Sequence, residues 1–510
     1  MYAKINTCVL QGLDGLLIDV EADLANGLPS FNIVGLPDTS IKESKERVRA
    51  AIANSGYKFP INRITINLAP ANLKKEGSQL DLAIATALLV ANGNIIDEPK
   101  KNTAFIGELA LDGRILAING ALPMVISLQE LGIEEVIIPE KNKEECSMVK
   151  GIKLYPVKNI EELVNFLNGN QEISPYESFD DGLLNQKKDE YEVDFSDIKG
   201  QEVLKRAMEI AAAGEHNLLM IGPPGSGKTM SAMRLPTILP NLTFEESLEC
   251  TKIYSASGNL KEDALIVKRP FRDPHHTSSA VSLIGGGRIP QPGEISLAHN
   301  GALFLDELPE FPKSTIEVLR QPLEEKTITI SRANATLTYP ANFLFIAGMN
   351  PCPCGYNGDP NHECSCSMGS IRNYLNKISR PILDRIDIHV EVKPVKIEDL
   401  QKKAKGESSK TIRKRVERAR AIQQKRFENE KITTNGQMKN KDMKKYIHLD
   451  DEVAKVMKMA YDRYKFSART YHKIIKLART IADLEESENI GEHHLLEAIR
   501  YRTVDQKYWG

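Results

Sequence analysis

The chain has 510 residues, of which 41% are hydrophobic and 27% are charged, and its formal net charge is −2. A single hydrophobic core does not organise so many residues, so the length predicts three or four domains. The balanced charge excludes a polycationic protein and confines any nucleic-acid surface to a local patch.

No targeting or membrane segment is expected. No apolar run approaches the roughly 20 residues that a membrane span needs. The first residues, MYAKINTCVLQGLDG, lack a basic segment followed by an apolar one, so they do not predict a signal peptide. We therefore expect a cytoplasmic protein that does not associate with membranes.

The first 169 residues alternate short apolar strands with helices. Strands are predicted at residues 16–24, 63–70 and 134–140, where apolar or β-branched residues recur. Residues 80–93, LDLAIATALLVANG, predict a buried helix that ends at Gly93. The segment therefore predicts an α/β or α+β domain.

Three changes of composition divide the rest of the chain. Residues 170–198 carry nine acidic residues against two lysines and predict a mobile acidic linker. Residues 199–395 predict an α/β unit. Residues 396–440 form a basic connector, whose helix at 411–427 is either a solvated face or a nucleic-acid contact. Residues 441–510 predict a small helical bundle.

A phosphate-binding motif opens the second α/β unit. LLMIGPPGSGKT is an apolar strand, then G-x-x-x-x-G-K-T, then a helix. Its glycines let backbone N–H groups and the helix N-terminus face an anion. Lysine and threonine would reach the terminal phosphates of ATP and Mg²⁺. The motif residues are Gly222, Pro223, Pro224, Gly225, Ser226, Gly227, Lys228 and Thr229.

Two further strands end in polar residues that complete this site. GALFLDELPEF ends a strand in Asp306 and Glu307, which we expect to hold Mg²⁺ and to act as general base, respectively. NFLFIAGMN ends a strand at Asn350, which would sense the γ-phosphate and orient the attacking water.

Two arginines are expected to act on phosphate. Arg385, in RPILDRIDIHVEV, is placed to complete the site of a neighbouring subunit, although a surface pair with Asp384 also explains it. Arg469, in the helical bundle, is expected to close over the phosphates bound by its own chain.

Four of the seven cysteines lie close together as two C-x-C pairs, with nine residues between Cys354 and Cys364. Four thiolates would bind Zn²⁺ tetrahedrally, whereas an iron–sulfur cluster or free thiols are the alternatives. A structural zinc ion would hold the loop that follows Asn350 in one conformation. His362 is an alternative ligand. The cysteines are Cys352, Cys354, Cys364 and Cys366.

These motifs, in this order, resemble the AAA+ ATPases. Residues 269–311, with GMNPCPCG and RPILDRIDIHVEV, resemble the magnesium-chelatase ATPase subunit and, over nearly the whole chain, the YifB/ComM family. The resemblance implies a ring, expected to be hexameric, with Arg385 as a trans-acting finger and Arg469 as the second sensor. It also implies DNA as the substrate of a branch-migration motor.

The same resemblance implies inserted elements near a ring pore. Residues 272–300 would be one insert, and residues 326–347 predict a β-hairpin with its tip near Arg332. Lys326 and Arg332 are the expected DNA contacts, since basic hairpins track a phosphate backbone; a structural hairpin is the alternative. His275 and His276 are adjacent, so on a strand they would face opposite sides.

The N-terminal segment resembles the Lon-protease and ribosomal S5-like fold. In LKKEGSQLDLAIATALL, Gly77 matches the Lon glycine, but Gln79 replaces the nucleophile. In AINGALPM, Leu122 replaces the catalytic lysine. Lys74 and Lys75 are expected to be ordinary solvated lysines. We therefore expect a protease-shaped domain without its catalytic dyad.

Three functions remain open at this stage. An ATP-driven ring motor acting on DNA is favoured by the ATP motif, the hairpin and the basic connector. An ATP-dependent protease or protein-remodelling factor is opposed by Gln79 and Leu122. A partner in metal insertion into a tetrapyrrole is less favoured, because the N-terminal domain and the cysteine loop depart from the chelatase subunit.

Overall fold

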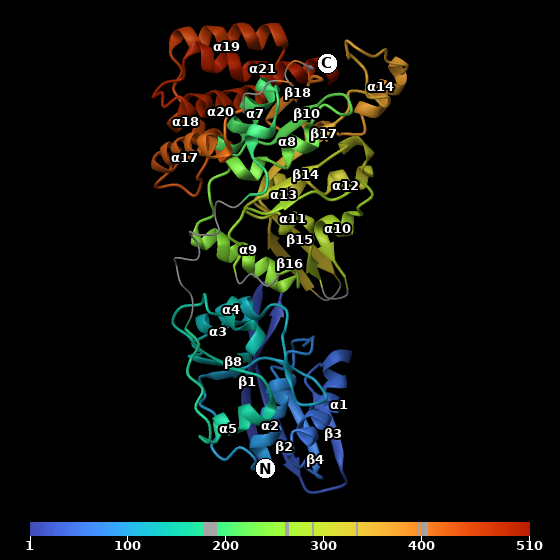
Figure 1. Cartoon of the computed structure of the whole chain (residues 1–510), viewed down its shortest axis with the longest axis vertical. Coiled ribbons are helices and arrows are strands. Elements are labelled where there is room, and N and C mark those ends of the chain that lie inside the picture. The colour runs from blue at the N-terminus through green and yellow to red at the C-terminus, as the bar shows by residue number, and fades with distance from the viewer. Residues whose placement is uncertain are drawn as a thin grey trace.

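A computed structural model of the chain describes residues 1–177, 191–260, 265–287, 290–332, 335–395 and 406–509, together with positions 398 and 401. The N-terminal domain lies at one end of the molecule, the second α/β domain in the middle and the C-terminal helices at the far end (Figure 1). Within these residues, no helix is long and apolar enough to cross a membrane.

The N-terminal domain is built on a mixed sheet of seven strands in the order β3-β4-β2-β1-β5-β8-β9. The predicted strands at 16–24, 63–70 and 134–140 and the helix at 80–93 are confirmed. The strands are β1 Tyr2–Gln11, β2 Asp14–Ala25, β3 Ser30–Val34, β4 Arg63–Ala69, β5 Thr103–Phe105, β8 Glu135–Pro139 and β9 Lys153–Val157, with β6 Glu108–Leu109 and β7 Ile115–Leu116 as a separate ribbon. The helices are α1 Thr39–Asn54, α2 Asp81–Ala91, α3 Ala121–Glu130, α4 Lys143–Cys146 and α5 Ile160–Leu167.

Helix α2 is apolar around its whole circumference, and ten of its eleven residues are buried. Its buried Asp81 is paired with Arg47 of α1, whose Nε lies 2.6 Å from the carboxylate. Burial raises the pKa of Asp81, and the Arg47 guanidinium and the Ser44 hydroxyl oppose that shift. The pair therefore ties α1 to the otherwise apolar α2.

The second domain contains a five-stranded parallel sheet in the order β11-β14-β17-β10-β18. Every residue of β10, β14 and β17 is buried, as expected for a sheet covered on both faces. The strands are β10 Leu218–Ile221, β11 Phe271–Arg272, β14 Ala302–Leu305, β17 Leu344–Met349 and β18 Ile388–Glu391, with the short ribbon β12 Gly285–Gly286 and β13 Gln291–Pro292 and the hairpin β15 Thr327–Arg332 and β16 Ala335–Pro340. The helices are α7 Glu202–Gly214, α8 Lys228–Ala232, α9 Phe244–Ala256, α10 Ala280–Ile284, α11 Glu294–Leu297, α12 Lys313–Glu317, α13 Arg320–Glu325, α14 Met368–Leu375 and α15 Arg380–Leu383.

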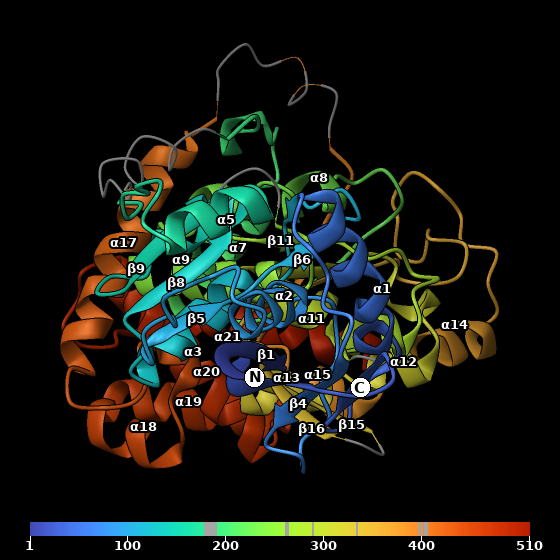
Figure 2. The same ribbon diagram turned by 90° about the horizontal axis from the view of Figure 1, so that it is seen from below.

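The C-terminal part is helical, as predicted. Helix α17 and the cysteine loop before α14 lie on opposite sides of the central domain (Figures 1 and 2). Residues Ile412, Val416 and Ala419 of α17 are buried in the core that α7 and α20 share. The helices are α17 Ser409–Arg426, α18 Asn440–Tyr446, α19 Asp451–Tyr464, α20 Ala468–Leu484 and α21 Glu492–Trp509.

The expected acidic linker at 170–198 is shorter at its C-terminal end. Phe195 is buried in the core of the second domain, and its backbone N–H donates to Ser409 Oγ at 2.7 Å. Asp194 caps this turn and accepts from the Ser409 N–H. Residues 191–198 therefore pack with the second domain, and residues 178–190 lie outside the described part.

Two contacts fix the N-terminal domain to the second domain. Helix α9 packs on α3 and α4, where Ser255 Oγ donates to the buried Glu145 carboxylate at 2.7 Å and Ser255 O accepts from the Gly120 N–H at 2.9 Å. The turn between β1 and β2 packs on the β15–β16 hairpin, where Leu13 joins the cluster that contains Leu337. The hairpin thus has one face against the N-terminal domain.

Removing the cation from the buried pair in the N-terminal domain tests its contribution. We expect Arg47→Ala to destabilise this domain by about 3 kcal/mol, because it leaves the Asp81 carboxylate buried without a partner. Urea unfolding followed by circular dichroism measures the change. Lys42→Ala, an exposed position on the same helix, is the matched control, and an equal loss there would contradict the assignment.

Candidate active site

The expected nucleotide motifs meet at one edge of the parallel sheet. Strands β10 and β17 run side by side, with Ile221 opposite Met349, and Leu305 of β14 lies opposite Ala347. The residues that follow these strands therefore emerge at the same carboxyl edge. The Gly222 N–H donates to Met349 O at 3.1 Å, which fixes the start of the phosphate loop.

Lys228 turns back into its own loop. Its Nζ donates to Gly222 O at 2.7 Å, to Pro223 O at 3.0 Å and to Asn350 Oδ1 at 3.3 Å. Burial lowers the pKa of Lys228 to about 8, although the Asp306 and Glu307 carboxylates act in the opposite direction. An anionic ligand would supply the counter-charge that this buried ammonium needs.

The pair expected to hold magnesium is in place. The Thr229 hydroxyl donates to the Asp306 carboxylate, and the Glu307 N–H donates to Asp306 Oδ1 at 2.9 Å. The neighbouring strand leaves room for this carboxylate only because residue 348 is glycine: a Cβ there would lie 2.7 Å from Asp306 Oδ1. The carboxylate and hydroxyl oxygens are hard donors, which suit Mg²⁺.

Glu307 has a partner that was not predicted. His276 Nδ1 lies 3.1 Å from Glu307 Oε2. His275 and His276 do not lie on a strand, because β11 ends at Arg272, and their two rings lie 4.1 Å apart in the following loop. The sequence shows that the two histidines are adjacent. The contact between His276 and Glu307, however, depends on how their loop packs beside β14.

Arg385 and Arg469 lie at the amino edge of the sheet. Arg385 comes before β18, and Arg469 Nη1 lies 3.2 Å from the adjacent Asp384 carboxylate. Both line a cavity of about 260 Å³ that also includes Asn217, which comes just before β10. The phosphate loop follows β10 at the opposite edge, so Arg469 does not reach the phosphate site of its own chain.

This position corrects the expected role of Arg469 as a sensor within one chain. The Arg385 guanidinium is held by Glu324 and by Pro381 O, the latter at 2.8 Å. Both arginines instead belong to one face, directed away from the chain's own phosphate loop. The arrangement fits phosphate bound by a second copy.

The hairpin predicted to contact DNA is present as β15 and β16, but Lys326 is not on it. Lys326 is the C-cap residue that follows α13, and its Nζ lies 3.4 Å from Glu215. Its charge is therefore balanced within the chain. Arg332 ends β15, and the tip at 333–334 lies outside the described residues.

The basic helix α17 uses several charges inside the molecule. Arg415 pairs with Glu209 and Glu407, and Arg420 donates to Ala212 O at 2.8 Å. Arg426 pairs with the buried Asp483. These contacts favour the structural interpretation of this helix over a nucleic-acid contact.

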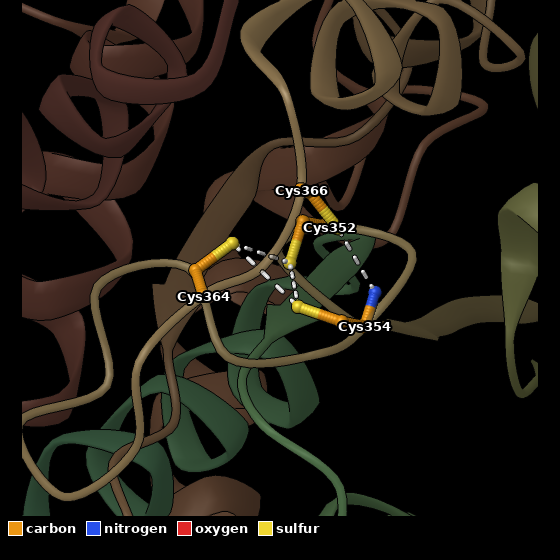
Figure 3. Close-up of side chains that lie close together, drawn as sticks. All are labelled: Cys352, Cys354, Cys364 and Cys366. Carbon is orange, nitrogen blue, oxygen red and sulfur yellow. Dashed lines mark hydrogen bonds between the residues drawn. The ribbon is translucent and has the colours of Figure 1, made fainter.

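The four cysteines converge as expected for a metal site (Figure 3). The Cys352 sulfur lies 3.3 Å from that of Cys354 and 3.7 Å from that of Cys364, and the Cys354–Cys364 distance is 3.6 Å. All four sulfurs lie within 4.8 Å of one another. Zn–S bonds of about 2.3 Å in a tetrahedron require S···S distances of about 3.8 Å, so the cluster fits zinc.

Backbone N–H groups also suit thiolates. The Asn357 N–H donates to Cys352 Sγ at 3.3 Å, and the Cys354 N–H donates to Cys366 Sγ at 3.4 Å. The backbone N–H of Tyr356 lowers the pKa of the Cys354 thiol to about 6. His362 stacks on Tyr356 with ring centroids 4.7 Å apart and is not a member of the cluster.

A second group, Glu485, His493 and His494, is less suited to metal. His494 Nδ1 accepts the Gly491 N–H at 2.8 Å, so the proton of the neutral ring is on Nε2. That nitrogen lies 3.1 Å from Glu485 and donates to it. A ligating histidine instead uses one nitrogen for the metal and donates through the other.

The Lon-like loop of the N-terminal domain holds a different set of contacts. The Ser78 hydroxyl donates to the Glu108 carboxylate, Gln79 Nε2 donates to Glu76 O at 2.8 Å, and Leu122 is fully buried. The expectation that Lys75 is solvated is wrong: the residue is buried, and its Nζ donates to Gly35 O and Pro70 O. Lys75 thus ties the ends of β3 and β4 to this loop.

Comparison with known families matches all three parts of the chain. The magnesium chelatase subunit ChlI model matches residues 194–400, a second ChlI model matches residues 20–142, and the ChlI C-terminal model matches residues 406–502. The matches cover the N-terminal domain, the parallel-sheet domain and the C-terminal helices.

Two similar proteins match this chain over nearly its whole length, and a third matches only part of it. The chain is 42% identical over 496 residues to competence protein ComM of Haemophilus influenzae, covering 97% of this chain and 96% of that protein. It is 40% identical over 508 residues to YifB of Escherichia coli, covering 98% and 97%. The Lon protease of Trichlorobacter lovleyi is 28% identical over 172 residues, covering 31% of this chain and 21% of the protease.

Filling the space beside Asp306 tests the metal-binding geometry. We expect Gly348→Ala to lower Mg²⁺-dependent nucleotide turnover by about 100-fold, because the added methyl group displaces the carboxylate. A phosphate-release assay across a magnesium titration measures the change. Gly369→Ala, where the nearest atom to a new Cβ is 3.9 Å away, is the control. Normal turnover in Gly348→Ala would refute the placement of Asp306.

Proposed function

Because the chain belongs to the ComM/YifB family of magnesium-chelatase-like AAA+ proteins, we propose that it hydrolyses ATP and uses the energy to remodel DNA. The observation that carries the ATPase part is the convergence of Lys228, Thr229, Asp306 and Asn350 at the carboxyl edge of the sheet. The DNA part rests on the similarity to a competence protein.

The chain's residues have distinct roles in this proposal. The loop 222–229 binds the phosphates through backbone N–H groups, and Lys228 neutralises their charge. Thr229 and Asp306 hold Mg²⁺, which supplies charge neutralisation when bound. Glu307 accepts a proton from the attacking water, and Asn350 orients that water.

The site is completed by a second copy of the chain. Arg385 and Arg469 lie at the sheet edge opposite the phosphate loop, so they are placed to act on nucleotide held by a neighbour. A guanidinium stabilises charge that spreads over the transferred phosphoryl group. This division of the site requires head-to-tail contact between copies of the chain, and we propose that the copies close into a hexameric ring.

The proposed DNA interface is the β15–β16 hairpin, through Arg332. Lys326 is withdrawn from this interface because Glu215 balances its charge.

Proteolysis is the second candidate function because of the Lon-like fold, and Gln79 and the buried Leu122 oppose it. We place the activity in the cytoplasm, where ATP and reduced cysteines coexist.

The cysteine cluster is proposed to hold one structural zinc ion. The convergence of four sulfurs at distances close to those of a tetrahedral site supports this assignment. The metal would close the loop between β17 and α14.

Two substitutions separate nucleotide binding from hydrolysis. We expect Lys228→Ala to abolish tight ATP binding, because the buried cation that faces the phosphates is removed. We expect Glu307→Gln to bind ATP and hydrolyse it at least about 100-fold more slowly, because the amide accepts no proton. Equilibrium binding of a fluorescent ATP analogue and phosphate release measure the two effects; unchanged turnover in Glu307→Gln would refute its role as base.

Mixing experiments test the shared site. Arg385→Ala alone is expected to be inactive, because every site lacks the neighbour's guanidinium. Adding it to Lys228→Ala protein is expected to restore part of the hydrolysis, since some sites then combine an intact phosphate loop with an intact Arg385. Failure of two inactive variants to complement each other would argue against a role across subunits.

The DNA part is tested by ATP hydrolysis with single-stranded, duplex and four-way-junction DNA at two salt concentrations. Stimulation by DNA that weakens at higher salt is the expected result, because phosphate contacts release counterions. Hydrolysis indifferent to every DNA would remove DNA as the substrate while leaving the ATPase in place.

A further inference from the structure

The loop that carries the four cysteines is continuous with the nucleotide site. Asn350, which accepts a hydrogen bond from Lys228 at 3.3 Å, is separated from Cys352 by one residue. Cys352 is buried, whereas the other three cysteines are half-buried. The first thiol of the cluster is therefore fixed within two residues of a side chain that contacts the phosphate-binding lysine.

The loop also touches the phosphate loop directly. Gly355 has a φ of +87°, and a Cβ placed there would lie 2.6 Å from Pro224 Cδ. A cavity of about 560 Å³ lies between the two loops and is lined by Gly222 and Pro223 on one side and by Gly355 and Asn357 on the other. The two loops therefore meet at Gly355 and Pro224, where a side chain larger than glycine would clash, and a cavity separates them elsewhere.

A third contact lies beyond the cluster. Helix α14 begins at Met368, with Ser367 as its cap, and carries Tyr374, whose hydroxyl lies close enough to the Asn350 backbone for that N–H to oppose the rise in the Tyr374 pKa that burial causes. The cysteine loop therefore joins two segments that meet again at Asn350. A change in the spacing of its two ends would be transmitted to that residue.

Few buried side chains hold the cysteine loop in shape. From Pro353 to Ser367, Gly355 alone is buried, and the residues between the two C-x-C pairs are rich in glycine, proline and polar side chains. Four thiolates brought this close repel one another unless a cation lies between them. A cation bound by the four cysteines would therefore fix the conformation of the cysteine loop.

We propose that the thiolate-bound metal sets the geometry of the ATP site, so that the chain binds nucleotide tightly only when the Cys352–Cys366 cluster is loaded. This inference rests on the proposed ATPase function and adds a metal requirement to it. The metal class is one that prefers four thiolates, with zinc as the ion to be tested. The metal takes no part in the chemistry. It holds Asn350 in a fixed position relative to the phosphate loop.

The test compares four proteins: wild type, Cys364→Ser/Cys366→Ser, Gly355→Val and the control Ser365→Ala, an exposed position between two of the cysteines. Elemental analysis gives zinc per chain, and titration with a fluorescent ATP analogue gives Kd. Hydrogen exchange reports the protection of residues 222–229. Exchange in α2 of the N-terminal domain shows whether the rest of each variant is folded.

The wild type and Ser365→Ala are expected to hold about one zinc per chain. The double cysteine variant is expected to lose the zinc, to bind nucleotide about 10- to 100-fold more weakly and to expose residues 222–229, with α2 unchanged. Gly355→Val is expected to keep the zinc and still bind nucleotide weakly, because it disturbs the contact with Pro224. Stripping the wild type with a chelator should reproduce the cysteine variant, and added zinc should reverse it.

Unchanged nucleotide affinity and unchanged protection of residues 222–229 in the zinc-free variant would overturn the inference while leaving the ATPase proposal intact. A wild-type protein that lacks thiol-bound metal yet binds ATP would overturn it as well. A wild type that holds zinc but neither binds nor hydrolyses ATP would instead overturn the proposed function. Lys228→Ala, which should keep its zinc and lose nucleotide, distinguishes these cases.

Discussion

The parallel direction of the five central strands is the constraint on which the rest of the structure depends. Because all strands point the same way, the segments that follow β10, β14 and β17 gather at one edge and those that precede β10 and β18 gather at the other. The first edge holds a buried lysine, a carboxylate and an amide that suit a magnesium-bound triphosphate. The second holds Arg385 and Arg469. In the proposed function, the two halves of a phosphoryl-transfer site are separated in one chain by the length of its central strands.

The N-terminal domain and the cysteine loop both pack on the domain that contains this sheet, and each contacts an element with a proposed function. The N-terminal domain packs on α9 and on the β15–β16 hairpin. A movement of the hairpin would therefore change its contacts with that domain. The cysteine loop packs on the phosphate loop at Gly355 and follows Asn350 directly in the chain. In the protease-like domain at one end of the molecule, Ser78 is held by Glu108 and the buried Lys75 ties loops together.

The sequence predicts local features well and long-range contacts poorly. The phosphate loop, Asp306 and Asn350 are predictable because each lies directly after an apolar strand, and strand direction then brings them together. The pairing of His276 with Glu307, the burial of Lys75 and the neutralisation of Lys326 by Glu215 depend on packing between segments far apart in the chain. The same is true of Arg469, whose helix could have packed over either edge of the sheet. A charge is visible in a sequence, whereas its partner is not.

The central claim is that one chain holds only part of a working nucleotide site. The most direct measurement is the rate of ATP hydrolysis per chain as the protein is diluted, with sedimentation recorded at the same concentrations. The account predicts that the specific rate falls steeply when the assembly dissociates, because Arg385 and Arg469 no longer reach a neighbour's phosphates. A specific rate that stays constant down to concentrations at which the protein sediments as a monomer would contradict it.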